Sequence, residues 1–513
     1  MNGAEALART LVAAGIEVCF ANPGTSEMHF VSALDRVPGL RCVLGLAETV
    51  VAGCADGYGR MAGKPAATLL HCGPGLANGI ANFHNARRAF TPIVGIVGDH
   101  ATYHRAHDAP LTADTEGLAR TVSHWVRTSA SAATVAPDAA AAVQAARSPP
   151  GGIATLVLPA DCAWDEGAQP AAALAAPRRA APAPETIRDV ARALRSGEAA
   201  MLVLSNEALG EAGLRAAQRV AHASGARLRT PTQVPRMARG RGRPPVDRIP
   251  YVVDAALKVL QGTRHLILAG AKAPVGFFAY PGKPSTLWPP DCTLHVLARV
   301  EQDAVAALEA LADELGAPRA VPAPDPGPAP GPQRGAFKPD AFGHTLATLL
   351  PEDAIVAEDA VTSGRALFAA TFAAAPHDWI QLTGGAIGHA FPAATGAAVA
   401  CPQRKVVCLQ ADGAGMYSLQ ALWTQARERL DVVNVVFANR RYAILQGELA
   451  AVGATPGPAS RELFDLARPE IRWTQFAEGL GVEAVRVATL EAFADAFGSA
   501  CARRGPFLIE FAI

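Results

Sequence analysis

Two polar residues, Asp412 and Asn439, lie where two neighbouring strands are expected to end. Residues 405–409 and 432–437 are short apolar runs typical of buried parallel strands, with a helix expected between them. Such a unit brings both side chains to one carboxyl edge, where open α/β sheets bind ligands. A carboxylate, an amide oxygen and a backbone carbonyl suit Mg²⁺ and leave positions for phosphate oxygens. The spacing predicts a magnesium–phosphate site; the alternative is a turn Asp and a strand-end Asn, both common in loops.

Short buried strands alternate with helices along the whole chain. An amphipathic helix over 3–15 is followed by apolar runs that glycine or proline bound, and strands separated by helices in this way are typical of doubly wound parallel sheets. We therefore expect an α/β protein with three such sheets. The runs lie at 16–20, 42–46, 67–70, 92–97 and 152–158, then at 200–204, 265–269 and 293–298, and finally at 354–357, 405–409, 432–438 and 506–511.

Two segments rich in alanine and proline divide the chain. The first covers residues 166–186, and the second, APRAVPAPDPGPAPGPQ at 317–333, contains seven prolines. Such segments are expected to be extended linkers. The predicted organisation is a domain over 1–170, a domain over 187–318, a linker over 319–335 and a domain over 336–513.

Composition excludes several classes of protein. The 513 residues carry 46 basic and 46 acidic side chains, so bulk charge does not favour nucleic acid. No apolar run reaches the roughly 18 residues of a membrane helix, and residues 1–20 resemble a helix and a strand rather than a secretion signal. The nine cysteines form no CxxC pair, which suits reduced thiols. We expect a cytoplasmic protein without nucleic-acid or membrane partners.

The segment that contains Asp412 and Asn439 resembles the diphosphate-binding motif of thiamine-diphosphate enzymes. By this resemblance Asp412, Asn439 and the carbonyl of Arg441 hold Mg²⁺. The motif usually reads Gly-Asp-Gly and then Asn-Asn, whereas this chain has alanine at both first positions. The first alanine matters only if its turn needs a positive φ. The same resemblance implies that further residues of this segment contact the cofactor, namely Gly413, Ala414 and Tyr442.

Residues 44–60, LGLAETVVAGCADGYGR, resemble the cofactor-activating segment of the same family. The matching carboxylate is Glu48, whose implied role is a hydrogen bond to the aminopyrimidine ring. That bond favours the imino tautomer, which removes the thiazolium C2 proton to give the ylide. The alternative is a glutamate at a helix N-terminus, favoured there by the helix dipole.

Three more motifs follow the family order. Residues 22–27, NPGTSE, resemble an active-site loop in which Thr25 or its neighbours face the substrate. Residues 71–79, HCGPGLANG, resemble the next loop, and His71 matches an acid–base histidine of benzoylformate decarboxylases. Residues 383–392 resemble the segment beneath the cofactor. There Gly385 is expected to offer its carbonyl to the 4′-amine and Ile387 to bend the cofactor. The alternative is a glycine-rich helix start packed in the core, which does not explain why all five motifs occur in family order.

These motifs imply pyrimidine-binding, middle and diphosphate-binding domains and a resemblance to benzoylformate decarboxylase and to acetolactate-synthase-like large subunits. The implied activity is decarboxylation of a 2-oxo acid, followed by aldehyde release or by ligation to a second carbonyl. The resemblance also implies a homodimer or homotetramer whose active sites lie at the subunit interface, with the glutamate and the metal site from opposite chains. A non-catalytic relative or partner subunit is the alternative, whereas a nicotinamide dehydrogenase lacks its glycine-rich fingerprint here.

The predicted middle domain departs from benzoylformate decarboxylase. Residues 273–280 contain no histidine, and Ala279 falls nearest the position of a second catalytic histidine, beside Phe277 and Phe278. Slow protonation would favour carboligation. FAD is not expected, because no G-x-G-x-x-G follows a strand in this part. The seven arginines within 227–248 are interpreted as a solvated loop, with an anion site as the alternative, and the histidines within 98–107 as cleft-edge residues rather than a metal site.

Overall fold

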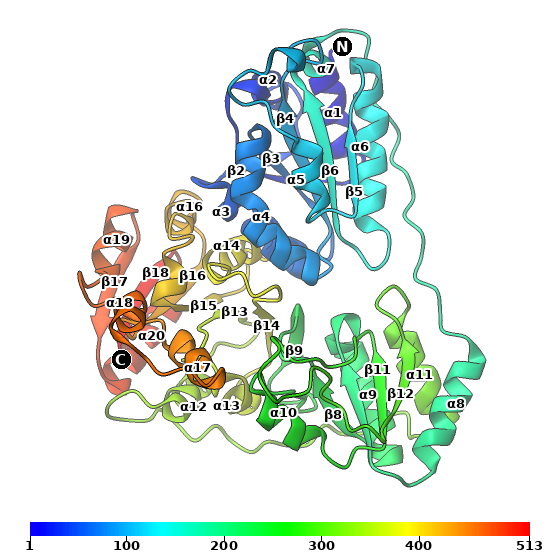
Figure 1. Cartoon of the computed structure of the whole chain (residues 1–513), viewed down its shortest axis with the longest axis vertical. Coiled ribbons are helices and arrows are strands. Elements are labelled where there is room, and N and C mark those ends of the chain that lie inside the picture. The colour runs from blue at the N-terminus through cyan, green and yellow to red at the C-terminus, as the bar shows by residue number, and fades with distance from the viewer.

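The computed structural model describes residues 1–513, and its first sheet forms the upper part of Figure 1. Six parallel strands lie in the order β2-β1-β3-β4-β6-β5. Two apolar clusters cover its faces, one beneath α1, α2, α6 and α7 and the other beneath α3, α4 and α5. The strands are β1 (Val18–Asn22), β2 (Arg41–Leu44), β3 (Ala66–Leu70), β4 (Ile93–Asp99), β5 (Trp125–Thr128) and β6 (Ile153–Pro159). The helices are α1 (Gly3–Ala13), α2 (Met28–Leu34), α3 (Glu48–Ala62), α4 (Cys72–Arg88), α5 (Thr115–Arg120), α6 (Ala132–Arg147) and α7 (Ala160–Trp164).

The second sheet lies below the first and has the parallel order β10-β8-β7-β11-β12. An extended segment leads to it from the first sheet, and α8 begins at Pro184, inside the expected linker 166–186. The strands are β7 (Ala200–Leu204), β8 (Arg227–Thr230), β10 (Asp247–Arg248), β11 (His265–Ala269) and β12 (Thr293–Ala298). The helices are α8 (Pro184–Arg195), α9 (Glu211–Ser224), α10 (Val253–Leu260) and α11 (Ala304–Glu314).

The third sheet has seven strands in the order β17-β18-β16-β15-β13-β14-β9. Six are parallel, and β9 (Arg236–Arg239) joins from the second unit and pairs antiparallel with β14. The others are β13 (Ile355–Asp359), β14 (His377–Gln381), β15 (Val406–Ala411), β16 (Val432–Ala438), β17 (Glu483–Val487) and β18 (Phe507–Ala512). The helices are α12 (Pro339–Leu349), α13 (Leu367–Ala370), α14 (Ala390–Ala400), α15 (Asp412–Gly415), α16 (Ala421–Arg427), α17 (Ala443–Ala451), α18 (Pro458–Phe464), α19 (Trp473–Gly479) and α20 (Leu490–Cys501).

Alternate residues of the third sheet's central strands point to different cores. Val406 and Cys408 of β15 pack with α3 and α14, whereas Val407 and Leu409 pack with α12, α20 and the second unit. This period of two is what a sheet buried on both faces requires. The third unit therefore joins the other two, and the predicted fold class of three doubly wound parallel sheets is confirmed, apart from the antiparallel strand β9.

Helices α3 and α14 cross with their backbones in contact. A Cβ at Gly57 would overlap the carbonyl of Ala393, and one at Gly396 would overlap the carbonyl of Cys54. Only glycine allows this approach, which is why the small residues of both helices line the crossing. The crossing fixes the first sheet relative to the third.

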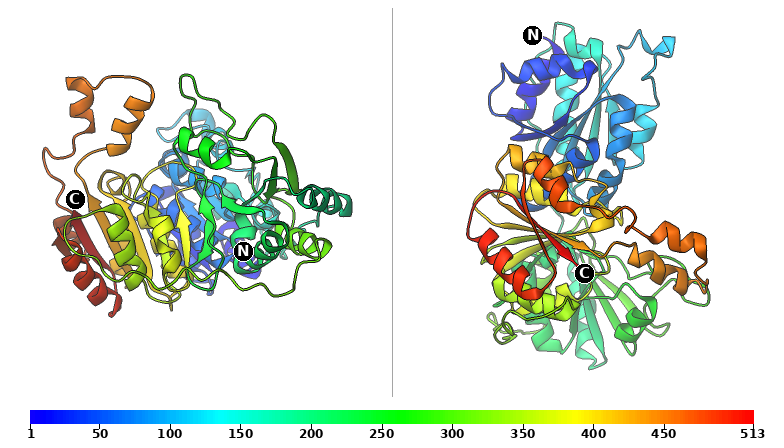
Figure 2. Two further views of the ribbon diagram at one scale, coloured as in Figure 1. Left: turned by 90° about the horizontal axis from the view of Figure 1, so that it is seen from below. Right: turned by 90° about the vertical axis from the view of Figure 1, so that its left-hand side faces the viewer.

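Helices α17 and α18, coloured orange, stand out from the body in both views of Figure 2, and neither contains a buried residue. No helix of the chain is both long enough and apolar enough to cross a membrane.

Candidate active site

The ends of β15 and β16 bring Asp412 and Asn439 to one edge of the third sheet. Asp412 is 3% exposed, and its Oδ2 accepts a 2.6 Å hydrogen bond from the backbone N–H of Arg440. Its Oδ1 accepts the N–H of Gly413 at 2.8 Å. Asn439 Oδ1 accepts the N–H of Arg441 at 3.0 Å. The two side chains predicted from the spacing therefore occupy adjoining turns.

Burial raises the pKa of the Asp412 carboxyl, and the N–H groups of Arg440 and Gly413 only partly offset this effect. A bound cation would supply the charge that favours the ionised carboxylate. Ser418, on the segment that follows Asp412, has a fully buried hydroxyl with no hydrogen-bond partner. A buried carboxylate and an unpartnered hydroxyl fit a site for a divalent cation and phosphate oxygens.

The two alanines at the motif's first positions cause no strain. Ala411 has a φ of −75°, so this turn does not need the glycine usual in the family. Ala438 ends β16 as a buried strand residue. At Gly413, in contrast, a Cβ would overlap the ring of Tyr442, which packs directly on the backbone. Ala414 is buried in α15. Arg441 is exposed, and its backbone forms an isolated antiparallel β-bridge with Asp465.

The segment over 383–389 is held from both sides. Asp359, at the end of β13, accepts the N–H groups of Gly388 and His389 at 2.8 and 3.0 Å. Asn85 of α4 donates to the carbonyl of Ala386 at 2.8 Å. Burial raises the pKa of Asp359 to about 7, although these hydrogen bonds lower it. Gly385 has a φ of 79°, which favours glycine, and Ile387 is half-buried two residues on.

Glu48 is the first residue of α3, where an acidic side chain complements the helix dipole. Its carboxylate is half-buried and accepts a 3.2 Å hydrogen bond from Asn78 of α4. It forms no ion pair with a cationic side chain. The carbonyls of Thr49 and Gly388 both accept from the amide of Asn82, at 2.9 and 3.5 Å. The start of α3 therefore lies beside the segment 383–389 of the same chain.

A buried charge network ties α3 to α14. Asp56 and Arg60 pair at 2.6 Å, and His389 Nε2 lies 2.9 Å from Asp56 Oδ2. Burial favours a higher pKa for Asp56, but the charge of Arg60 and the His389 hydrogen bond outweigh it and hold the pKa at about 2. Arg60 also donates to Thr383 at 2.9 Å, so the network reaches the segment 383–389.

Thr25 and His71 lie at the carboxyl edge of the first sheet. Thr25 is exposed in a short 3-10 helix over Thr25–Glu27, and His71 lies between β3 and α4. His71 Nδ1 lies 3.0 Å from Oε2 of Glu27, a buried carboxylate. Nothing in the resemblance of residues 22–27 singles out Glu27, although its spacing of three residues from Gly24 suits the capping interaction in which it accepts the N–H of Gly24.

Phe277 covers the segment 383–389 from the second unit. Its Cζ lies 2.8 Å from where a Cβ at Gly385 would be, and its ring centre is 5.2 Å from that of Tyr251. A cavity of about 870 Å³ opens beside Phe277 and Gly384, between the three units. The aromatic side chains of Phe277 and Tyr251 thus line this cavity together with polar residues such as His84, Arg87 and Lys272.

The arginine-rich stretch 227–248 is not a solvated loop, so that interpretation is wrong. It forms β8, β9 and β10, and Arg239 is fully buried against Phe368, Phe372 and Trp379. The guanidinium of Arg239 lies over these aromatic rings, and this cation–π attraction offsets part of the free-energy cost of burying the charge.

The histidines within 98–107 follow β4 with neighbouring rings tilted by 48° and 53° and ring centres 5.5 and 5.6 Å apart. They belong to no group of three candidate ligands with converging atoms; the chain has one such group, Glu27, His71 and Cys72.

Comparisons with known proteins agree with this geometry. Residues 1–118 match the family model "Thiamine pyrophosphate enzyme, N-terminal TPP binding domain", and residues 362–511 match the corresponding C-terminal domain. The chain is 51% identical to "Putative acetolactate synthase large subunit IlvX" of Mycobacterium tuberculosis, across 100% of this chain and 99% of that protein. It is 28% identical to benzoylformate decarboxylase of Pseudomonas aeruginosa, across 97% and 96%.

A solved structure has the same architecture. The thiamine diphosphate-dependent 4-hydroxybenzoylformate decarboxylase of Rhodococcus jostii RHA1 superposes with a TM-score of 0.86 at 25% identity, covering 100% of this chain and 99% of that one. The chain belongs to the thiamine pyrophosphate enzyme family. Within it, the protein is a thiamine-diphosphate-dependent 2-oxo acid enzyme of the decarboxylase and acetolactate-synthase-like group.

Proposed function

We propose that the protein uses thiamine diphosphate and Mg²⁺ to remove CO₂ from a 2-oxo acid and passes the remaining acyl unit to a second carbonyl compound. The observation that carries this proposal is the pairing of Asp412 with the turn after β16. It sets a buried carboxylate beside Asn439 at the sheet edge where phosphates bind. When bound, thiamine diphosphate supplies the electron sink that makes loss of CO₂ possible.

The chain's own residues have distinct proposed roles. Asp412, Asn439 and the carbonyl of Arg441 would hold Mg²⁺, and the backbone at Gly413 and Ala414, with Tyr442, would border the diphosphate. Glu48 would hydrogen-bond the aminopyrimidine and hold its proton. Gly385 would offer its carbonyl to the 4′-amine, and Ile387 would support the rings. Thr25 and His71 would face the substrate, with His71 moving protons.

Ligation to a second carbonyl is favoured over aldehyde release because of the second unit's surface. Phe277 covers Gly385, and neither it nor the neighbouring Phe278 carries an ionisable group. The segment over 273–280 therefore contributes no proton donor of the histidine type. With protonation slow, an added aldehyde or 2-oxo acid has time to react with the acyl unit.

We propose that two copies of the chain share each active site, with Glu48 of one copy facing the cofactor that Asp412 of the other would hold. The contact of α3 with residues 383–389 of its own chain then belongs to the packing between units of one subunit. Leu46 lies two residues before Glu48, and Met416 and Tyr417 follow Asp412; these apolar side chains are 44%, 37% and 56% exposed. Exposed apolar side chains on both halves of a site are typical of a surface that a second chain covers.

The direct test measures CO₂ release from a panel of 2-oxo acids with thiamine diphosphate and Mg²⁺, with and without an added aldehyde. We expect release that depends on both additives, and a carboligation product when the aldehyde is present. Release of free aldehyde in its place would contradict the ligation step. No release from any acid would contradict the proposed activity.

A further inference from the structure

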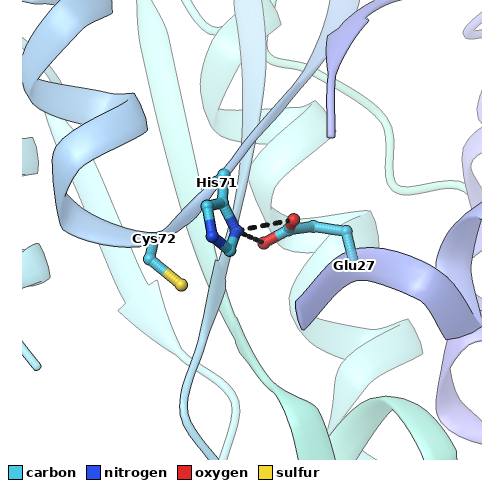
Figure 3. A group of neighbouring side chains, drawn as sticks. All are labelled: Glu27, His71 and Cys72. Carbon is cyan, nitrogen blue, oxygen red and sulfur yellow. Dashed lines mark hydrogen bonds and ion pairs between the residues drawn. The ribbon is translucent and has the colours of Figure 1, made fainter. Parts of the chain in front are cut away.

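Glu27, His71 and Cys72 form a compact cluster at the carboxyl edge of the first sheet (Figure 3). One carboxylate oxygen, one ring nitrogen and the sulfur all lie within 4.8 Å of one another. Glu27 ends the 3-10 helix over Thr25–Glu27, His71 is the residue between β3 and α4, and Cys72 is the first residue of α4. We propose that this cluster binds a thiophilic divalent cation such as Zn²⁺, and that the bound ion inhibits the enzyme.

The ligand atoms converge on a single hydroxyl. Ser26 Oγ lies 3.3 Å from His71 Nδ1 and 3.2 Å from Cys72 Sγ, and it also contacts Glu27. Three groups with lone pairs are thus directed at one point, which a hydrogen-bond donor now fills. Rotation of Ser26 about χ1 would free that point for a cation, with water as the fourth ligand of a tetrahedral site.

The cluster is held in place rather than free to spread. A Cβ at Gly24 would overlap the His71 ring, and a Cβ at Gly98 would overlap the Glu27 carboxylate. The N–H of Gly24 donates to Glu27 Oε2 at 2.7 Å. Cys72 has a φ of 49°, a left-handed conformation that is uncommon outside glycine and is often found at functional sites. Glu27 and Cys72 are 2% and 1% exposed.

The donor set selects a different metal from the one proposed at Asp412. Sulfur and imidazole nitrogen suit Zn²⁺ and Co²⁺, whereas Mg²⁺ prefers oxygen ligands. Burial raises the pKa of the Cys72 thiol to about 11, and the nearby charges of Glu27 and Asp99 add to this rise. The thiol is therefore protonated at neutral pH. Binding releases its proton to solvent and transfers no electron.

The inhibitory effect rests on the proposed function, in which His71 moves protons. An ion on Nδ1 prevents that nitrogen from exchanging a proton with Glu27 or with a substrate. It also places positive charge beside the substrate loop. The binding itself does not depend on the proposed reaction.

The experiment titrates Co²⁺ into the cofactor-free full-length protein in a non-thiol reductant. A thiolate ligand gives a charge-transfer absorption in the near ultraviolet, which an oxygen-only site does not. We expect this band to saturate at one equivalent, to disappear in Cys72→Ser and to remain in Cys42→Ser, the matched control for an exposed thiol of the same sheet. A missing band in the wild type, or a band that survives in Cys72→Ser, would overturn the proposal.

Two further measurements keep the test decisive. If circular dichroism shows that Cys72→Ser does not fold, Glu27→Gln replaces it, with Co²⁺ affinity expected to fall about tenfold or more; unchanged affinity would count against the site. Zn²⁺ is expected to suppress wild-type turnover in excess Mg²⁺, with recovery on adding a zinc-selective chelator. A cobalt band without turnover on any 2-oxo acid would contradict the proposed function and would still support the metal site. Turnover without a cobalt band would support the proposed function and contradict the metal site.

Discussion

The carboxylate of Asp412 accepts a 2.6 Å hydrogen bond from the backbone N–H of Arg440, although 28 positions separate them. Arg440 has a φ of 57°, so the chain turns sharply just after Asn439 and directs its N–H toward β15. This contact sets the distance between the two predicted metal ligands before any ion binds. A site preorganised in this way loses little entropy on binding.

Replacing Asp412 by alanine should weaken cofactor binding before it affects chemistry. The variant lacks the buried carboxylate that would compensate the cation between protein and diphosphate. We expect calorimetry with Mg²⁺ to show at least about a tenfold loss of thiamine diphosphate affinity. Asp340→Ala, which removes an exposed carboxylate from α12, is the control and should bind normally. Equal affinity of the two variants would rule out the assigned role of Asp412.

Mixing two inactive variants tests whether chains share a site. If each site combines Glu48 of one chain with Asp412 of another, a dimer of Glu48→Gln with Asp412→Ala has one intact site. Random mixing after co-refolding should then restore about a quarter of wild-type turnover. If each site is built from one chain, every site carries a mutation and the mixture stays as inactive as its components.

The buried carboxyl of Asp359 predicts an unusual dependence of stability on pH. Its pKa is raised from 3.8 to about 7, so folding favours the protonated form. The stabilisation is complete below about pH 4 and is lost as pH rises through about 7, an effect of at most about 4 kcal/mol. Asp359→Asn keeps a carbonyl oxygen for the N–H groups of Gly388 and His389 and cannot ionise. We expect the urea midpoint of the wild type to fall relative to the variant between pH 4 and 7; parallel curves would refute the assignment.

Phe277 is expected to set the preference for aromatic substrates. Removing its ring in Phe277→Ala opens the space above Gly385 and removes a face on which an aromatic 2-oxo acid could pack. Aromatic pairs contribute about 0.5–1.5 kcal/mol, so kcat/KM for benzoylformate should fall about two- to tenfold, with little change for pyruvate. Val275→Ala, an exposed position of the same segment, is the control. A uniform loss on both substrates would show that the ring has another role.

The sequence predicts the sheets best where strands are apolar on both faces. Residues 200–204, 265–269 and 432–438 form β7, β11 and β16 with the expected bounds, because continuous apolar runs leave one interpretation. Strands β5, β8, β10, β14 and β17 were not predicted, since exposed or polar residues interrupt their apolar pattern.

Strand β9 could not be predicted from local pattern at all. Its sequence, RMAR, contains two arginines and belongs to the second unit along the chain, yet it pairs with β14 of the third. Arg236 is held by an ion pair with Asp378 at 2.8 Å, and Arg239 by aromatic rings. These partners come from distant positions, so only the folded chain reveals why arginine is accommodated there.

The sequence predicts which site residues lie at strand ends, but it does not predict the hydrogen bonds that hold these residues in place. Asp412 and Asn439 follow from spacing, because parallel strands end at one edge. Asp359 accepts the N–H of His389, which is 30 positions away in the sequence. Glu27 contacts His71, which is 44 positions away. These residues lie at or near the ends of strands and helices that the hydrophobic pattern predicts. Their hydrogen-bond partners, however, depend on how those strands and helices pack in the folded chain.

Glu48 is proposed to activate the bound cofactor, and exchange of the thiazolium C2 proton tests this role most directly. Glu48→Gln keeps the size and the hydrogen bond to Asn78 but cannot hold a proton for the ring. Thiamine diphosphate affinity should change little, because Asp412 and Asn439 are untouched. We expect hydrogen–deuterium exchange at C2 to slow by about 10²–10⁴-fold relative to the wild type. Equal exchange rates in the two proteins, both saturated with thiamine diphosphate, would contradict the proposed role of Glu48.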